Sequence, residues 1–242
     1  MSLPLNVLIT ILTLFPEIFP QVLSYSILGR AQKKNLVKIQ YVNIRDFATG
    51  KHKSVDDKPY GGGVGMIMRV DVLEKAIEKS RTKSDQPLAE KIKEKVVLLD
   101  PTGKMFNQAT ARRYSKLDHL ILVCGHYEGV DGRIYSFVDE VISIGNYILS
   151  GGEGAAIVVV DAAVRLIPRV LTKKSAVVDE SFSRANVLEH PQYTRPAVYK
   201  GLIVPKILLS GDHQKILEWQ KNQSKTRSKK VDPSIRQLTD SG

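Results

Sequence analysis

Residues 143–154 have the sequence Ser143-Ile144-Gly145-Asn146-Tyr147-Ile148-Leu149-Ser150-Gly151-Gly152-Glu153-Gly154. They follow the short run Glu140-Val141-Ile142 and lead into the apolar segment 155–160, so their glycines stand where a strand is expected to end and a helix to begin. Glycine allows a close approach of the backbone to a ligand, and a helix start presents unpaired N–H donors. Taken alone, the stretch is equally consistent with a binding loop and with a tight turn that binds nothing.

Two other loops have the same setting. The apolar segment 96–99 ends at the turn signal Asp100-Pro101-Thr102-Gly103, and the apolar segment 119–124 ends in Gly125-His126-Tyr127-Glu128-Gly129-Val130-Asp131-Gly132. Helices are expected around 108–115 and from 155 to about 167. Strands that alternate with helices predict a largely parallel α/β sheet, in which ligands bind at the carboxyl ends of the strands. The loops 99–103, 125–132 and 144–154 are therefore the candidate binding site.

The N-terminal part of the chain fits the same fold class. Strands are expected at 6–14 and 36–44 with a helix between them that reaches Lys33, and a capping-box variant predicts a helix over 71–80. The segment 56–66 is rich in glycine, but Lys58-Pro59-Tyr60 stands where a nucleotide-binding turn would have a buried strand. It is interpreted as a flexible loop that faces RNA or acts as a lid.

Composition bounds the class of protein. The 242 residues carry a formal charge of +11 and include one cysteine, which excludes an internal disulfide and a multi-cysteine metal site. Residues 172–242 hold 13 Lys and Arg against 7 Asp and Glu, a balance that suits a polyanion such as RNA as well as a solvated surface. Neither a membrane-spanning run nor a secretory signal is recognisable, so a cytoplasmic protein is expected.

The last third of the chain is organised differently. Asp161 and Arg165 lie four residues apart on one helix face, where an ion pair is the simplest interpretation. Residues 172–184 are polar, lack helical periodicity and are interpreted as a linker. A helix is expected from about 213 to Lys221, and Trp219 on it is expected in the core because apolar residues precede it.

Seven ordered blocks carry a resemblance to a known family: Leu14-Phe15-Pro16-Glu17, Asp57-Lys58-Pro59-Tyr60-Gly61-Gly62-Gly63, Cys124-Gly125-His126-Tyr127-Glu128-Gly129, Ser143-Ile144-Gly145, Leu149-Ser150-Gly151-Gly152-Glu153, Tyr193-Thr194-Arg195-Pro196 and Leu208-Leu209-Ser210-Gly211. Over essentially its whole length the chain resembles bacterial tRNA (guanine-N1)-methyltransferase. The resemblance implies a SPOUT-type α/β fold with a trefoil knot, a homodimer with the active site between subunits, and S-adenosylmethionine as methyl donor. The implied acceptor is N1 of tRNA guanosine 37, just 3′ of the anticodon.

The same resemblance implies a domain layout and a set of site residues. A methyltransferase domain is expected over 1–168 with a donor-binding knot at about 96–160, then an interdomain linker over 169–184 and a mostly helical tRNA-binding domain over 185–242. Cys124 is interpreted as a small buried hydrophobe. The residues that the resemblance places around the donor are Leu99, Pro101, Gly125, Tyr127, Glu128, Gly129, Ile144, Gly145, Asn146, Tyr147, Ile148, Leu149, Gly151 and Gly152.

Methylation at N1 needs a base, because this nitrogen carries a proton at neutral pH, and the charge that builds on O6 needs a cation or donor. The resemblance assigns to Arg165 the stabilisation of the charge on O6. It places an aspartate directly before Ser181-Phe182 as the base, but this position is Glu180, with Asp179 one residue earlier. Glu180 is favoured, because its position relative to Phe182 fixes the direction of its side chain. The chain also has Asn146 where the family usually has aspartate, and Gln192 where it often has histidine.

Two alternatives remain at the level of sequence: a SPOUT methylase for another RNA position, and a donor-binding RNA-binding protein without catalysis. A P-loop nucleotidase is excluded because no G-x-x-x-x-G-K-[ST] motif is present. No ligand-spaced histidine pair predicts a protein-held metal. A loosely bound magnesium ion near RNA or the donor would leave no such pattern.

Overall fold

A computed structural model describes residues 7–82, 92–172, 180–184 and 186–230. The chain divides into two compact units, Met1–Thr172 and Lys173–Gly242. The first unit contains the three glycine-bearing loops and Arg165, and the second contains Glu180. Among the described residues, no helix combines the length and the hydropathy that crossing a membrane requires.

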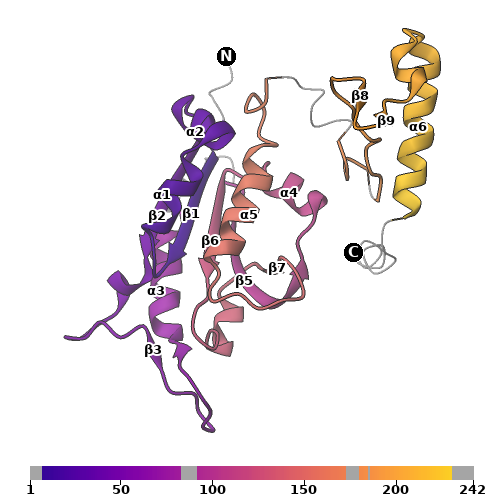
Figure 1. Cartoon of the computed structure of the whole chain (residues 1–242). Helices are drawn as coiled ribbons and strands as arrows, with labels where there is room; N and C mark the ends of the chain where they lie inside the picture. Colours follow the sequence, from indigo (N-terminus) through magenta and orange to yellow (C-terminus); the bar gives the residue numbers. More distant parts are fainter. Residues whose placement is uncertain (1–6, 83–91, 173–179, 185, 231–242) are drawn as a thin grey trace. The chain divides into compact units, whose positions relative to one another are not determined.

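A five-stranded sheet forms the centre of the first unit in the described part of the chain, with the strand order β2-β1-β6-β5-β7 (Figure 1). Every neighbouring pair is parallel, which confirms the predicted parallel α/β sheet. The strands are β1 (Val7–Thr13), β2 (Val37–Asn43), β5 (Glu94–Met105), β6 (His119–Cys124) and β7 (Glu140–Ser143).

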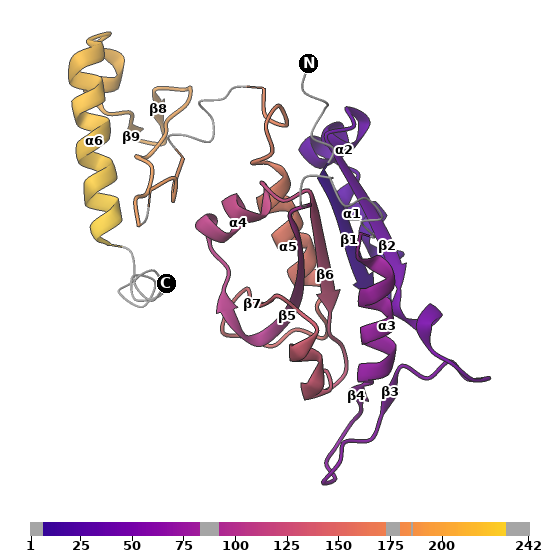
Figure 2. The same ribbon diagram turned by 180° about the vertical axis from the view of Figure 1, so that it is seen from behind.

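Helices cover both faces of this sheet, so its central strands are buried on both sides. Along β6, Leu120 and Leu122 belong to one hydrophobic cluster, while Ile121 and Val123 belong to the other. This alternation follows from the two-residue period of a strand, and a near-continuous apolar sequence is its signature in parallel sheets. The first cluster includes residues of α1 (Ile18–Leu23), α2 (Ser26–Lys33), α4 (Gln108–Tyr114) and α5 (Glu153–Val164). The opposite face, seen in Figure 2, is covered by α3 (Val70–Ser80) with the 3₁₀ turns η1 (Ile44–Phe47) and η2 (Gly132–Ser136).

Three local expectations need correction. The helix expected to run unbroken to Lys33 is two helices, because Ser26 has φ 48°, outside the right-handed helical region. The turn expected at 100–103 is a bulge inside β5, which pairs with β7 through Leu99 and again through Lys104. The expected helix over 71–80 forms, but Arg69 is its N-cap and no side chain caps it, so the predicted capping box is absent from this described helix.

The glycine-rich segment 56–66 forms most of a small hairpin. Strand β3 (Asp56–Asp57) pairs antiparallel with β4 (Ile67–Met68), and the connection projects from the unit, with Tyr60 100% exposed. The hairpin is anchored at its base, because Met68 N donates to Gly129 O at 2.9 Å and Glu128 N donates to Met66 O at 3.1 Å. The expected loop is therefore exposed at its tip and fixed to the loop 125–132 at its base.

The second unit contains the hairpin β8 (Val198–Tyr199) and β9 (Leu202–Ile203), the turn η4 (Lys206–Leu209) and the helix α6 (His213–Lys229). Helix α6 extends past the predicted end at Lys221, because residues 222–229 contain neither proline nor glycine. The core position expected for Trp219 is wrong: no residue of α6, which is described throughout, is buried. Its ring instead lies 6.3 Å from the rings of His190 and Tyr193, measured between centroids.

A buried polar network lies at the amino ends of the strands, away from the three loops. His119 is 2% exposed; its Nε2 lies 2.7 Å from Thr10 Oγ1 and its Nδ1 lies 2.8 Å from Glu94 Oε2. Gln40 donates to Thr10 Oγ1, so the Thr10 hydroxyl hydrogen is available to Nε2 and Nδ1 carries the proton that Glu94 accepts. Burial lowers the pKa of His119, and the Glu94 carboxylate offsets this effect only in part.

This network predicts a pH dependence of stability. A histidine whose pKa is lower in the folded than in the unfolded state contributes stability that is present above the unfolded pKa, about 6.5, and is lost as the pH falls below it. We expect the free energy of unfolding, measured by urea denaturation, to decrease as the pH falls below about 6.5, and we expect His119→Gln to flatten this slope. His52→Gln, at an exposed histidine, is the control. An unchanged slope in His119→Gln would contradict the assignment.

Candidate functional site

The three candidate loops lie on adjacent strands: the first is the bulge within β5, and the other two follow the carboxyl ends of β6 and β7. The loop after β7 is bonded directly to the loop after β6, because Gly152 N donates to Gly125 O at 2.8 Å and His126 pairs with Gly151 in an isolated β-bridge. The first loop adjoins the second, since a Cβ atom on Gly125 would lie 3.8 Å from Leu99 O. The sequence-based expectation that these loops lie together is confirmed.

Glycine is needed at this meeting point for steric reasons. A Cβ atom on Gly152 would lie 2.7 Å from Cys124 Cα and 3.0 Å from Gly125 N, and both are backbone atoms that cannot rotate away. A Cβ atom on Gly103 would collide with the backbone of Val141 and Ile142. Both glycines therefore allow one backbone segment to pass directly over another.

The predicted donor-site residues divide by exposure within these loops. Leu99 and Gly152 are buried, and Gly125, Gly129, Ile144, Gly145 and Gly151 are half-buried. The remaining seven lie exposed around them: Pro101, Tyr127, Glu128, Asn146, Tyr147, Ile148 and Leu149. Five of the seven exposed residues are apolar or aromatic, and five of the seven less exposed ones are glycines, a composition that suits a flat heterocycle.

The last loop is held by its own hydrogen bonds. Ser143 Oγ donates to Gly145 O at 3.1 Å, and Tyr147 Oη donates to Ile144 O at 3.2 Å. The Tyr147 ring folds back over Gly145, where any Cβ atom would overlap it. Asn146, at the tip of this turn, is exposed.

A cavity of about 580 Å³ adjoins the second loop at the base of the β3–β4 hairpin. Its walls include Tyr60 from the hairpin and two arginines, each paired with a nearby aspartate: Arg69 with Asp71 at 2.8 Å and Arg133 with Asp131 at 2.6 Å. The hydrogen bonds from the guanidinium groups lower the pKa of both aspartates. The cavity is therefore polar and lined by charges of both signs.

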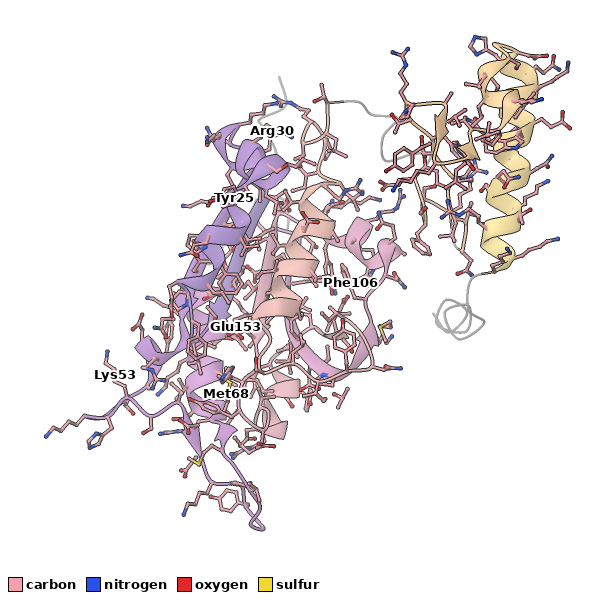
Figure 3. The ribbon with its side chains drawn as sticks, in the orientation of Figure 1. Tyr25, Arg30, Lys53, Met68, Phe106 and Glu153 are labelled. Carbon is pink, nitrogen blue, oxygen red and sulfur yellow. The ribbon has the colours of Figure 1, made fainter. Side chains whose placement is uncertain are left out.

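Sequence reasoning assigned no role to three residues, one on β1 and one in each of two loops, that the structure brings together. Glu153, at the first position of α5, is 7% exposed and accepts a hydrogen bond of 2.7 Å from Thr13 Oγ1 at the end of β1 (Figure 3). His126 Nδ1 lies 3.9 Å from Glu153 Oε2. An acidic residue two positions before the apolar run 155–160 was the available signal, but its partners are 140 and 27 positions away.

Cys124 is fully buried, as expected, beside this cluster. Burial raises the pKa of the Cys124 thiol, and the Glu153 carboxylate raises it further. The thiol is therefore protonated at neutral pH and unsuited to act as a nucleophile.

The two predicted catalytic residues belong to different units. Arg165 is the C-cap of α5, half-buried, with its backbone N bonded to Asp161 O at 3.3 Å. Glu180 is half-buried in the second unit, where its carbonyl accepts from Ser183 N at 3.0 Å. Asp179 lies outside the described residues. Gln192 donates to the Glu189 carboxylate.

Comparison with known proteins extends over nearly the whole chain. The family model of tRNA (Guanine-1)-methyltransferase TrmD matches residues 7–237. The chain is 49% identical over 227 residues to a tRNA (guanine-N(1)-)-methyltransferase of Clostridium botulinum (strain Eklund 17B / Type B), covering 94% of this chain and 91% of that protein. It is 51% identical over 217 residues to the protein of the same name from Carboxydothermus hydrogenoformans, covering 89% and 82%.

The packing at Gly152 predicts a large effect of a single methyl group. Gly152 has φ −73°, so Gly152→Ala introduces a purely steric conflict with Cys124, and we expect it to destabilise the first unit by about 1–3 kcal/mol. Gly132→Ala is the matched control, because no atom lies within 4 Å of the position of its Cβ atom. Thermal unfolding of both variants measures the difference, and equal melting temperatures would contradict the close approach.

Proposed function

Because the chain belongs to the tRNA (guanine-1)-methyltransferase family, we propose that this enzyme transfers a methyl group to N1 of guanosine 37, the nucleotide just 3′ of the anticodon. The family implies S-adenosylmethionine as donor and tRNA as substrate. The observation that carries the proposal is the family match over residues 7–237, which includes all three loops that meet at the strand ends.

The donor is proposed to bind at these loops. The fourteen predicted loop residues supply the contacts, with the glycines leaving room for the adenine and backbone N–H and C=O groups reading its edge. Support comes from the close passage of Gly152 over Cys124, which brings the backbones of two of the loops into direct contact. In this proposal Asn146, which is exposed at the tip of the turn, takes part through its backbone.

A trefoil knot within residues 96–160 is part of the same proposal. Two features support it: β5 pairs with β7 on both sides of the bulge at 100–103, and residues 151–152 pass against the end of β6. Both contacts require tight crossings of backbone, and glycines occupy them.

The proposed domain layout is a methyltransferase domain over 1–168, a linker over 169–184 and a tRNA-binding domain over 185–242. The division of the chain between Thr172 and Lys173 falls within the proposed linker. Helix α6 supports the RNA-binding role, because its cationic side chains are exposed and can contact phosphates. These are Lys215, Lys221, Lys225, Arg227 and Lys229.

The chemistry is assigned to Arg165 and Glu180. Guanine N1 attacks the methyl carbon of the donor, the carbon–sulfur bond breaks, and S-adenosylhomocysteine leaves. Glu180 accepts the proton of N1, and Arg165 stabilises the negative charge that develops on O6. Glutamate is one methylene longer than the family's aspartate, so the backbone at residue 180 must lie farther from guanine N1 for the carboxylate to reach the same point.

A homodimer completes the proposed site, with the donor of one subunit meeting residues of the other. Its support is an apolar surface on the first unit in which Ile18, Val22 and Val158 are 44%, 45% and 46% exposed. These residues come from α1 and α5, and Tyr25, labelled in Figure 3, is 70% exposed after α1. Exposed apolar side chains from adjacent helices are typical of an interface between subunits.

Magnesium has no evident protein site among the described residues, where no group of three His, Cys, Asp or Glu side chains could hold a metal. A magnesium ion would be held loosely, by tRNA phosphates or by the donor carboxylate. The cytoplasm is the proposed location, since the tRNA substrate is available there.

The target nucleotide is tested directly. An unmodified tRNA with guanosine at positions 36 and 37 is incubated with enzyme and labelled donor, beside a tRNA in which only guanosine 37 is replaced. We expect methyl incorporation into the first tRNA and none into the second, because only guanosine 37 reaches the site. Incorporation into both would place the methyl group elsewhere.

The general base is tested by two isosteric substitutions. We expect Glu180→Gln to reduce kcat by about 10²- to 10⁴-fold, the usual contribution of a general base, with donor affinity unchanged. Asp179→Asn is the matched control and should retain activity. Survival of activity in Glu180→Gln together with its loss in Asp179→Asn would assign the role to Asp179.

A further inference from the structure

Two ionisable side chains, those of His126 and Glu153, face each other where the loops 125–132 and 144–154 meet, with Gly151 between them. A Cβ atom on Gly151 would overlap both Glu153 Oε2 and His126 Nδ1. Residue 151 must therefore be glycine for the two groups to approach one another. Glu153 lies at the beginning of α5, and His126 lies two residues after the end of β6.

The Glu153 carboxylate has a fixed orientation. Its Oε1 accepts the Thr13 hydroxyl hydrogen at 2.7 Å, and the Thr13 oxygen in turn accepts from Phe15 N at 2.9 Å. Because Thr13 is fully buried at the end of β1, this pair of bonds holds Oε1 against the sheet and directs Oε2 toward the loop 125–132.

His126 is held by its ring but has an incomplete polar contact. Its ring centroid lies 5.1 Å from those of Phe15 and Tyr127. Within the described residues, its buried Nδ1 has no hydrogen-bond partner, and the 3.9 Å to Glu153 Oε2 is too long for one. A buried polar atom without a partner is unfavourable, so shortening this gap is favourable for folding of the loops.

We propose that His126 and Glu153 are positioning residues, which form a hydrogen bond across Gly151 when the donor binds and thereby fix the loop 125–132 against the loop 144–152. The inference rests on the proposed donor site, since Gly125 and Tyr127 flank His126 while Gly151 and Gly152 precede Glu153. A contraction of about 1 Å, from 3.9 Å to hydrogen-bonding distance, brings the backbone groups on both sides of the donor toward it.

A second histidine–glutamate pair in the same sheet supplies the comparison. His119 Nδ1 and Glu94 Oε2 lie 2.8 Å apart, so this bond is already formed, and it is at the opposite ends of the strands. The two pairs therefore share residue types but differ in their distance, in their proximity to the loops and in the exposure of the histidine side chain, which is 3% for His119 and 23% for His126. Glu94→Gln is the matched control for Glu153→Gln.

The test is a double-mutant cycle with His126→Gln, Glu153→Gln and the double variant. Glutamine at 153 still accepts from Thr13, so the fold is retained. We expect each single substitution to weaken donor binding, measured by titration calorimetry, by about tenfold, which is ~1.4 kcal/mol. The double variant should bind the donor no more weakly than the single variant with the lower affinity, because each single substitution already removes the His126–Glu153 bond.

Two further readouts separate positioning from other roles. The loss should be equal for S-adenosylmethionine and S-adenosylhomocysteine, because the pair acts on the loops and not on the sulfonium charge. The kcat at saturating donor should change little while the KM for the donor rises. Glu94→Gln should lower the melting temperature and leave donor affinity unchanged.

Several results would overturn the inference. Additive losses in the double variant would mean that the residues act independently, and a loss confined to S-adenosylmethionine would mean that Glu153 acts on the donor charge. Unchanged donor affinity in both single variants would make the pair purely structural. Failure of the wild-type protein to bind donor or methylate tRNA would instead overturn the proposed function, so the two failures are distinguishable.

Discussion

The close passage of Gly152 over Cys124 is the contact on which the first unit depends. It brings the chain after β7 back to the end of β6, at the distance that a Cβ atom would forbid. Because β6 lies at the centre of the sheet between β1 and β5, a segment fixed to its end is within reach of neighbouring strand ends. The hydrogen bond of 2.8 Å from Gly152 N to Gly125 O then sets the position of α5, which begins at the next residue.

Sequence patterns predicted those features of the fold that depend on neighbouring residues. The strand 119–124 was recognisable because burial on both faces requires an unbroken apolar run, and the parallel class followed from alternation of strands and helices. The extension of β5 through 100–103 was not predictable, since it depends on pairing with β7, about 40 positions later. Trp219 was misplaced for a related reason: the apolar residues beside it in sequence do not build a core around α6.

In the candidate site too, features that depend on neighbouring residues were predictable from the sequence, and contacts between distant residues were not. Glycine-bearing loops at strand ends were visible in the sequence, and the structure joins them. The cluster of Thr13, His126 and Glu153 was not visible, because its members come from three separate elements and none has a distinctive local pattern. The attachment of the 56–66 hairpin to Glu128 is a further case, since backbone hydrogen bonds make it and side-chain identity does not reveal them.

The burial of Glu153 is offset, in the described part of the chain, by one side-chain hydrogen bond, from Thr13, and by the start of α5. Removing a carboxylate from water costs several kcal/mol even after relaxation. The N-terminus of α5 returns about 0.3–1 kcal/mol and the Thr13 hydrogen bond about 1.5–3 kcal/mol. Glu94 is better compensated, with Thr82 N at 2.8 Å, His119 at 2.8 Å and Arg81 at 3.4 Å. These interactions outweigh burial and leave the pKa of Glu94 lowered, despite the rise that burial alone would cause.

The Glu94 and Glu153 carboxylates differ in how completely they are hydrogen-bonded and in their distance from the candidate site. Glu94 lies away from the three loops, and its hydrogen bonds to Thr82 and His119 are already formed. Glu153 lies between two loops of the candidate site. Its Oε2 is 3.9 Å from His126 Nδ1, about 1 Å more than a hydrogen bond requires, and this Nδ1 has no other partner among the described residues. If the His126–Glu153 hydrogen bond forms only when the donor binds, its free energy contributes to donor affinity and not to the stability of the protein without donor. An incomplete contact between the two loops allows binding to order them in this way.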